Sequence, residues 1–144
     1  MNYLEYIDTI PKIDQSLIDE AYWCINNNKN VYPDDSYQYY KTFNAGEKIK
    51  NFAYQYFTVD YSAKIHIVYK GLPIHKDLVR KEAFNYIIDP GGDNVYTCFF
   101  DDQKRFKQKF LIEKERWHRI QTDVYHFVMN ISHPRIAITI SKLN

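Results

Sequence analysis

Residues 135–141 read Arg-Ile-Ala-Ile-Thr-Ile-Ser, so that every second residue is isoleucine. Successive side chains of a β-strand point to opposite faces of its sheet. Ile136, Ile138 and Ile140 therefore share one face, and Arg135 shares the other face with smaller residues. We expect the isoleucine face to pack against helices and the face with the arginine to line an interior cavity.

The rest of the second half of the chain has the same period of two. Its short alternating runs are separated by turn residues, and the strongest turn signal is Asp-Pro-Gly-Gly-Asp-Asn at residues 89–94. Short strands at this spacing are typical of a β-sandwich of the jelly-roll type. The strands predicted before the last one cover residues 64–69, 84–88, 96–100, 106–112, 117–121 and 124–130.

The first sixty residues have a different period. Apolar residues recur three and four positions apart over residues 17–25 and again over residues 49–57, which predicts two amphipathic helices. Ser16 is placed to cap the first helix. The polar, tyrosine-rich stretch 31–44 is predicted to be a loop. No linker or repeat divides the chain, so we expect one domain over residues 1–144, with 1–60 as helical support and 61–144 as the β core.

Composition excludes several classes of protein. The chain has 19 basic and 18 acidic residues, interspersed along it, which disfavours nucleic acid as a partner. Its first ten residues do not resemble a signal peptide, and no stretch approaches the roughly 20 apolar residues that span a bilayer. We therefore expect no membrane association and a soluble, cytoplasmic protein. Cys24 and Cys98 are too few and too far apart for a disulfide scaffold or a thiolate zinc site.

The residues that indicate chemistry begin with His75-Lys76-Asp77. In an extended segment, residues i and i+2 project to the same side, so His75 and Asp77 can reach one cation. His126, in the predicted strand 124–130, can complete the set from another strand. Two imidazoles and one carboxylate occupy one face of a divalent metal and leave the opposite positions open for a chelating substrate and dioxygen.

Arg135 is the fourth element of this constellation. Burying a guanidinium is costly unless a carboxylate meets it, and its planar fork matches a carboxylate with two hydrogen bonds. The inner face of the last strand is therefore a predicted site for a bound dicarboxylate.

Together these residues resemble the non-haem Fe(II), 2-oxoglutarate-dependent oxygenases of the double-stranded β-helix fold, in particular small prolyl hydroxylase-like and phage-type members. Residues 71–77 are similar to the first metal-binding loop of that family, and residues 117–135 to the strand of its distal histidine and the neighbouring segment. The likeness covers residues 60 to 144. One departure is Ala137, which stands where many members carry a serine two residues after the arginine.

The resemblance implies a mainly β protein with N-terminal helices, whose core is a cupin-like jelly roll. It implies a catalytic Fe(II) centre held by His75, Asp77 and His126, and it assigns the remote carboxylate of 2-oxoglutarate to Arg135. Tyr86 and Thr97 are candidates for further contacts with this cosubstrate; Asn85 and Tyr96 are weaker ones. The partners would be 2-oxoglutarate, dioxygen and an unknown primary substrate contacted by residues 31–40, in a monomer or homodimer.

Alternatives remain open at this point. His118 competes with His126 as the third ligand, whereas His66 is interpreted as an ordinary strand residue. A second class of function is a cupin-like metal- or sugar-binding protein without oxygenase activity, because a fold alone does not select the chemistry. Arg135 discriminates between these classes, since a sugar site more often offers aromatic walls and neutral hydrogen-bonding groups.

Overall fold

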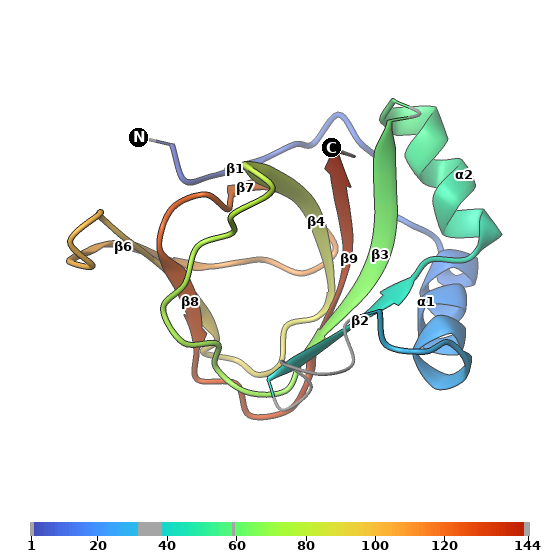
Figure 1. Cartoon of the computed structure of the whole chain (residues 1–144). Helices are drawn as coiled ribbons and strands as arrows, with labels where there is room; N and C mark the ends of the chain where they lie inside the picture. The colour runs from blue at the N-terminus through green and yellow to red at the C-terminus, as the bar shows by residue number, and fades with distance from the viewer. Residues whose placement is uncertain (1, 32–38, 59, 143–144) are drawn as a thin grey trace.

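Two antiparallel sheets and two helices make up the computed structural model, which describes residues 2–31, 39–58 and 60–142 (Figure 1). The large sheet has the strand order β1-β7-β4-β9-β3-β2, and the small sheet has the order β6-β5-β8. The elements are β1 (Leu4–Tyr6), α1 (Gln15–Asn27), β2 (Tyr40–Asn44), α2 (Glu47–Tyr56), β3 (Tyr61–Val68), β4 (Glu82–Asp89), β5 (Tyr96–Phe100), β6 (Phe106–Leu111), β7 (Trp117–Gln121), β8 (His126–Met129) and β9 (Arg135–Lys142).

Both helices lie on the outer face of the large sheet, as Figure 1 shows. The main core forms between the two helices and the large sheet. It includes Ile136, Ile138 and Ile140 of β9, together with Ala21 of α1 and Ile49 of α2. The isoleucine face of the last strand therefore meets the helices, as the alternation predicted. The opposite face of β9 points toward the space between the sheets, where the candidate site lies.

The helix starts depend on carboxylates. Asp14, rather than the predicted Ser16, caps α1 by accepting a hydrogen bond from Leu17 N at 3.2 Å. Ser16 instead donates its hydroxyl to the Asp14 carboxylate at 2.6 Å. The first turn of α2 is capped from a distance, because the Glu20 carboxylate of α1 accepts from the backbone N–H groups of residues 48 and 49. This contact ties the two helices together.

Two strands lie where none was predicted. The stretch 31–44 was predicted to be a loop, but its last residues form β2, which pairs with β3 along the edge of the large sheet. Residues 32–38 of that stretch lie outside the described residues. The three-residue β1 pairs with β7 at the other edge. The predicted strand 124–130 is shorter in the structure, because the chain bends at residues 123 and 124 and leaves the extended conformation at Asn130, whose φ is 67°.

Neither helix among the described residues has the length and apolar character needed to cross a bilayer.

Ile138→Ala is expected to lower the free energy of unfolding by about 3 kcal/mol, because it leaves a cavity at a fully packed position. Ile138 is 1% exposed and sits between Ile65 of β3 and Tyr86 of β4. Urea unfolding followed by far-UV circular dichroism measures the loss. Ile74→Ala, at a position that is 39% exposed, is the matched control with a change below about 1 kcal/mol. Equal decreases in the free energy of unfolding of the two variants would contradict the burial of Ile138 in the core.

Candidate metal centre and its cavity

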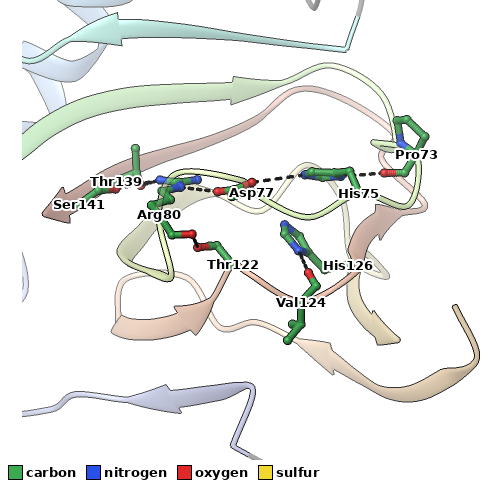
Figure 2. A network of polar contacts seen from close by, with 9 residues as sticks. All are labelled: Pro73, His75, Asp77, Arg80, Thr122, Val124, His126, Thr139 and Ser141. Atoms are coloured by element: carbon green, nitrogen blue, oxygen red, sulfur yellow. Dashed lines mark hydrogen bonds and ion pairs between the residues drawn. The ribbon is translucent and has the colours of Figure 1, made fainter. Parts of the chain in front are cut away.

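The structure brings His75, Asp77 and His126 together (Figure 2). One ligand atom from each residue lies within 4.8 Å of the others, and His75 Nε2 is 4.0 Å from Asp77 Oδ1. The segment before β4 lies antiparallel to β8 at this point. His75 N donates to His126 O at 3.0 Å, and His126 N donates to His75 O at 2.8 Å. The backbone therefore places two of the three side chains.

Both imidazoles are held in the tautomer that suits metal binding. Their Nδ1 atoms lie 2.8 Å and 2.7 Å from the backbone carbonyl oxygens of Pro73 and Val124, respectively. A carbonyl oxygen only accepts, so each Nδ1 carries the proton and each Nε2 keeps its lone pair for a metal. Burial lowers the pKa of His126, which keeps that ring neutral at pH 7. The sequence could not name these two carbonyl partners.

Asp77 is oriented by Arg80, three residues later. Arg80 Nε donates to Asp77 Oδ2, and Arg80 Nη1 donates to the hydroxyls of Ser141 at 2.9 Å and Thr139 at 3.4 Å (Figure 2). Thr122 anchors the same segment, because its carbonyl accepts from Asp77 N and its hydroxyl donates to Arg80 O. With Oδ2 occupied, Oδ1 is the carboxylate oxygen that faces the two imidazoles. The residues present therefore fit a divalent metal in donor type and tautomer.

Removing the guanidinium of Arg80 should allow the Asp77 carboxylate to rotate away from the two imidazoles. Arg80→Met is expected to weaken divalent-metal affinity by roughly 10-fold to 100-fold, as the loss of other groups that orient metal ligands does. Titration with Co(II), followed by its visible absorption, measures this change. Arg116→Met is the matched control, since Arg116 also pairs with carboxylates but does so at the surface, with Asp8 and Glu113. Unchanged affinity in Arg80→Met would contradict the orienting role.

Arg135 lies on the inner face of β9 and is 5% exposed. Its guanidinium donates to Pro90 O at 3.0 Å, Thr97 Oγ1 at 3.3 Å and Val95 O at 3.4 Å. Burial lowers its pKa to about 10, so the side chain is still charged at pH 7. Among the described residues no carboxylate pairs with it. Arg135 and Thr97 thus lie together, and this buried cation has only neutral partners.

Tyr86 does not join them. Its ring packs 5.2 Å from that of Trp117 in the core beneath the helices, and it is 1% exposed. Alternation along β4 gives the inner face to its neighbour Asn85, whose Oδ1 is buried without a hydrogen-bond partner. Asn85, the weaker candidate from the sequence, is therefore the β4 residue that faces the interior.

His118 also faces the interior but lies outside the cluster. It sits opposite Asn85 in the pairing of β7 with β4, is 0% exposed, and has no hydrogen-bond partner at either ring nitrogen. His66 of β3 likewise has a buried, unpartnered Nε2. Leaving buried polar atoms unpaired costs free energy, so these rings mark an interior built to receive polar groups. His66 lies within β3 and outside the cluster, in agreement with its interpretation as a strand residue.

A cavity of about 710 Å³ adjoins the cluster. Its walls come from the inner faces of β2, β3 and β9 and from the segment between β3 and β4 that carries His75, Asp77 and Arg80. Arg135 does not line this cavity.

Acid should destabilise the protein through His118. Burial lowers its pKa to about 4, against about 6.5 in the unfolded chain. Between these values the unfolded chain binds a proton that the folded protein does not. Stability is therefore retained above pH 6.5 and falls as the pH drops toward 4, by up to about 3 kcal/mol from this ring. Urea unfolding at pH 7.5 and 4.5 measures the decrease in the free energy of unfolding on acidification. This decrease should be smaller in His118→Phe than in the wild type, and it should have its wild-type size in His133→Gln.

Comparison with known proteins identifies the fold. No known protein-family model matches the sequence, and no curated protein does either. Among solved structures, a mutant of Bacillus subtilis oxalate decarboxylase matches 83% of this chain at 14% identity and a TM-score of 0.52. The polyketide cyclase RemF from Streptomyces resistomycificus matches 83% of it at 11% identity and a TM-score of 0.50. The chain spans 29% of the decarboxylase chain and 76% of the cyclase chain.

These likenesses, together with the two antiparallel sheets, show that the chain has a cupin-like double-stranded β-helix fold. The fold class predicted from the sequence is confirmed.

Proposed function

We propose that the protein is an Fe(II)- and 2-oxoglutarate-dependent dioxygenase that hydroxylates a primary substrate yet to be identified. The observation that carries this proposal is the convergence of His75, Asp77 and His126, with both Nε2 atoms and one carboxylate oxygen facing one another. Two imidazoles and a carboxylate on one side of the ion leave room for a chelating 2-oxo acid and dioxygen.

The buried charge of Arg135 supports the cosubstrate part of the proposal. Its partners are neutral, and the unpartnered Asn85 and His118 lie on the same inner face of the large sheet. A buried cation without a counter-ion is costly, and a bound carboxylate offsets that cost. A dicarboxylate that chelates the metal with its 2-oxo end can offer its other carboxylate to this region.

Each residue then has a distinct task. His75, Asp77 and His126 hold the metal, Arg80 keeps Asp77 Oδ1 turned toward it, and Arg135 with Thr97 binds the remote carboxylate. When bound, Fe(II) and 2-oxoglutarate supply the oxidising power for attack on a C–H bond.

One observation favours a second candidate, a cupin-like metal- or sugar-binding protein without oxygenase activity. The Arg135 guanidinium already bonds Pro90 O, Val95 O and Thr97 Oγ1, and it does not line the open cavity. In that case its role is to hold the turn after β4. Bacillus subtilis oxalate decarboxylase, of similar fold, has Mn(II) centers.

Anaerobic titration with Fe(II) and 2-oxoglutarate separates the two candidates. The oxygenase should develop a visible metal-to-ligand charge-transfer band that saturates at one equivalent of each. Succinate, which lacks the 2-oxo group, is the matched control and should give no band. Folded protein that binds Fe(II) but develops no band with 2-oxoglutarate would overturn the oxygenase proposal and favour the second candidate.

A further inference from the structure

β6 is an edge strand of the small sheet, and its outer edge is open in the described part of the chain. It pairs with β5 on one side, and no backbone hydrogen bond joins its other side to a described residue. Its residues are exposed apart from Phe110, which is partly buried. In Figure 1 the strand lies on the side of the molecule away from the helices. An open edge of this kind is a template for pairing with another extended chain.

The other edge strands do not offer such a template. The outer side of β2 is occupied by the segment before it, because Val31 N donates to Thr42 O at 2.7 Å and Asn30 Oδ1 accepts from Thr42 N at 3.0 Å. The outer side of β8 carries the bridge to His75. β1 has only three residues. β6 is therefore the longest open edge among the described strands.

The face of β6 that points away from the large sheet carries a basic side chain between two apolar ones. Phe99 of β5 packs into the core against the large sheet, so the residues on either side of it in β5 point outward. The register places Phe106 and Lys109 opposite those two residues. Leu111, two residues after Lys109, lies on the same face. Phe106 and Leu111 are 56% and 52% exposed, so two large apolar side chains flank a lysine at the open edge.

Lys109 has no carboxylate partner among the described residues. Its Nζ lies 4.5 Å from the centre of the Tyr96 ring. Lys107 Nζ is 4.0 Å from Asp101 Oδ2, which already pairs with Arg105 at 2.9 Å. An added strand with an acidic residue beside Lys109 gains a cross-strand pair of opposite charges, whereas a basic residue there is disfavoured.

Two other occupants fit this edge less well. Antiparallel pairing of β6 with the β6 of a second copy would bring the lysines at positions 107 and 109 of the two chains side by side, and like charges disfavour that arrangement. Single-stranded nucleic acid needs flat aromatic faces on which its bases stack. The Phe100 ring is only 9% exposed, and it is inclined at 77° to that of Phe106 and at 35° to that of Phe127. A peptide, in contrast, can pair with the backbone of the edge.

We propose that the open edge of β6 binds an extended acidic peptide segment of another protein, in which an acidic residue lies between two apolar residues at alternate positions. The peptide adds one strand to the small sheet and places its carboxylate beside Lys109. Its two apolar side chains cover Phe106 and Leu111. Backbone hydrogen bonds supply affinity in this mode of binding, and the alternate side chains supply specificity. The proposed surface shares no residue with the metal centre and does not depend on the oxygenase proposal.

Two blocked peptides, titrated into the isotope-labelled protein and followed by NMR, test the proposal. TVTETVT has an acidic residue between two valines at alternate positions, and TVTKTVT has a lysine in its place. The first should shift the backbone amide resonances of β6 and bind about fivefold more tightly than the second, with added NaCl reducing the difference. Lys109→Glu should reverse the preference. Lys41→Glu is the matched control and should keep it, since Lys41 also lies over a tyrosine ring on an edge strand.

N-methylated forms of the acidic peptide test the backbone pairing. Each form carries N-methyl groups on one set of alternate residues, and one of the two should lose binding because it lacks the N–H groups that face β6. Undiminished binding by both forms, no β6 shift at millimolar peptide, or an unchanged preference in Lys109→Glu would overturn the proposal. A dimer in analytical ultracentrifugation that Lys109→Glu dissociates would assign the edge to a second copy instead. Oligodeoxythymidine that shifts the β6 amides and binds more tightly than the acidic peptide would assign it to nucleic acid.

Discussion

His126→Ala should lower the affinity for Fe(II) by more than about 100-fold and abolish the charge-transfer band with 2-oxoglutarate. Losing a group that merely orients a ligand costs 10-fold to 100-fold, and loss of a ligand costs more. His126 is also the only one of the three cluster residues that comes from β8, so His75 and Asp77 alone would hold the ion from one side. Anaerobic isothermal titration calorimetry with Fe(II) measures the affinity.

His118→Phe is the matched control for this variant. Both histidines are buried, at 8% and 0% exposure, but His118 lies outside the cluster. The control should bind Fe(II) with wild-type affinity. Loss of metal binding in His118→Phe with retention in His126→Ala would reverse the assignment and make His118 the third ligand, the alternative that the sequence left open.

Arg135→Met is expected to weaken 2-oxoglutarate binding by about 100-fold while the affinity for Fe(II) changes less than about twofold. Methionine keeps most of the apolar stem and removes the charge. Truncating one partner of a buried, hydrogen-bonded charge pair costs about 2 to 5 kcal/mol or more, which corresponds to a large loss of cosubstrate affinity. The measurement is the 2-oxoglutarate concentration that half-saturates the charge-transfer band at fixed Fe(II).

The same variant removes the donors to Pro90 O and Val95 O, so its unfolding by urea is measured in parallel. Arg135→Lys keeps a positive charge but lacks the planar guanidinium. Its affinity for 2-oxoglutarate should lie between those of the wild type and of Arg135→Met. Wild-type affinity for 2-oxoglutarate in a folded Arg135→Met would show that Arg135 serves only the turn after β4. That result would favour the second candidate function.

The interior elements of the fold were predictable because their sequence alternates. The face of β9 that carries Ile136, Ile138 and Ile140 is identified by period alone. The strands β1 and β2 were missed because they are short, at three and five residues, and neither has a clear alternation. The cap of α2 was not predictable either, because Glu20 lies 28 residues before the Lys48 N–H group that it accepts from.

The candidate site divides in a similar way. His75 and Asp77 are two residues apart in an extended segment, and the family resemblance adds His126. The place of Arg80 depends on where β9 presents the hydroxyls of Thr139 and Ser141, which local sequence does not reveal. Its spacing of three residues from Asp77 was the available signal.

Tyr86 was a different kind of error in reading the site. Tyr86 and Asn85 are neighbours in β4. An alternation with a period of two predicts only that their side chains point to opposite faces of the sheet. Which face is inner follows from the helices that cover the other one.

The reciprocal backbone pair between His75 and His126 has a consequence for metal uptake. Since this bridge forms with the rest of the chain, the backbone positions of His75 and His126 are fixed relative to each other before any ion arrives. Uptake then requires little ordering of the polypeptide, and less of the coordination energy is spent on immobilising it. Apoprotein and loaded protein should accordingly share nearly the same backbone, with exchange of the ion governed by access through the open cavity.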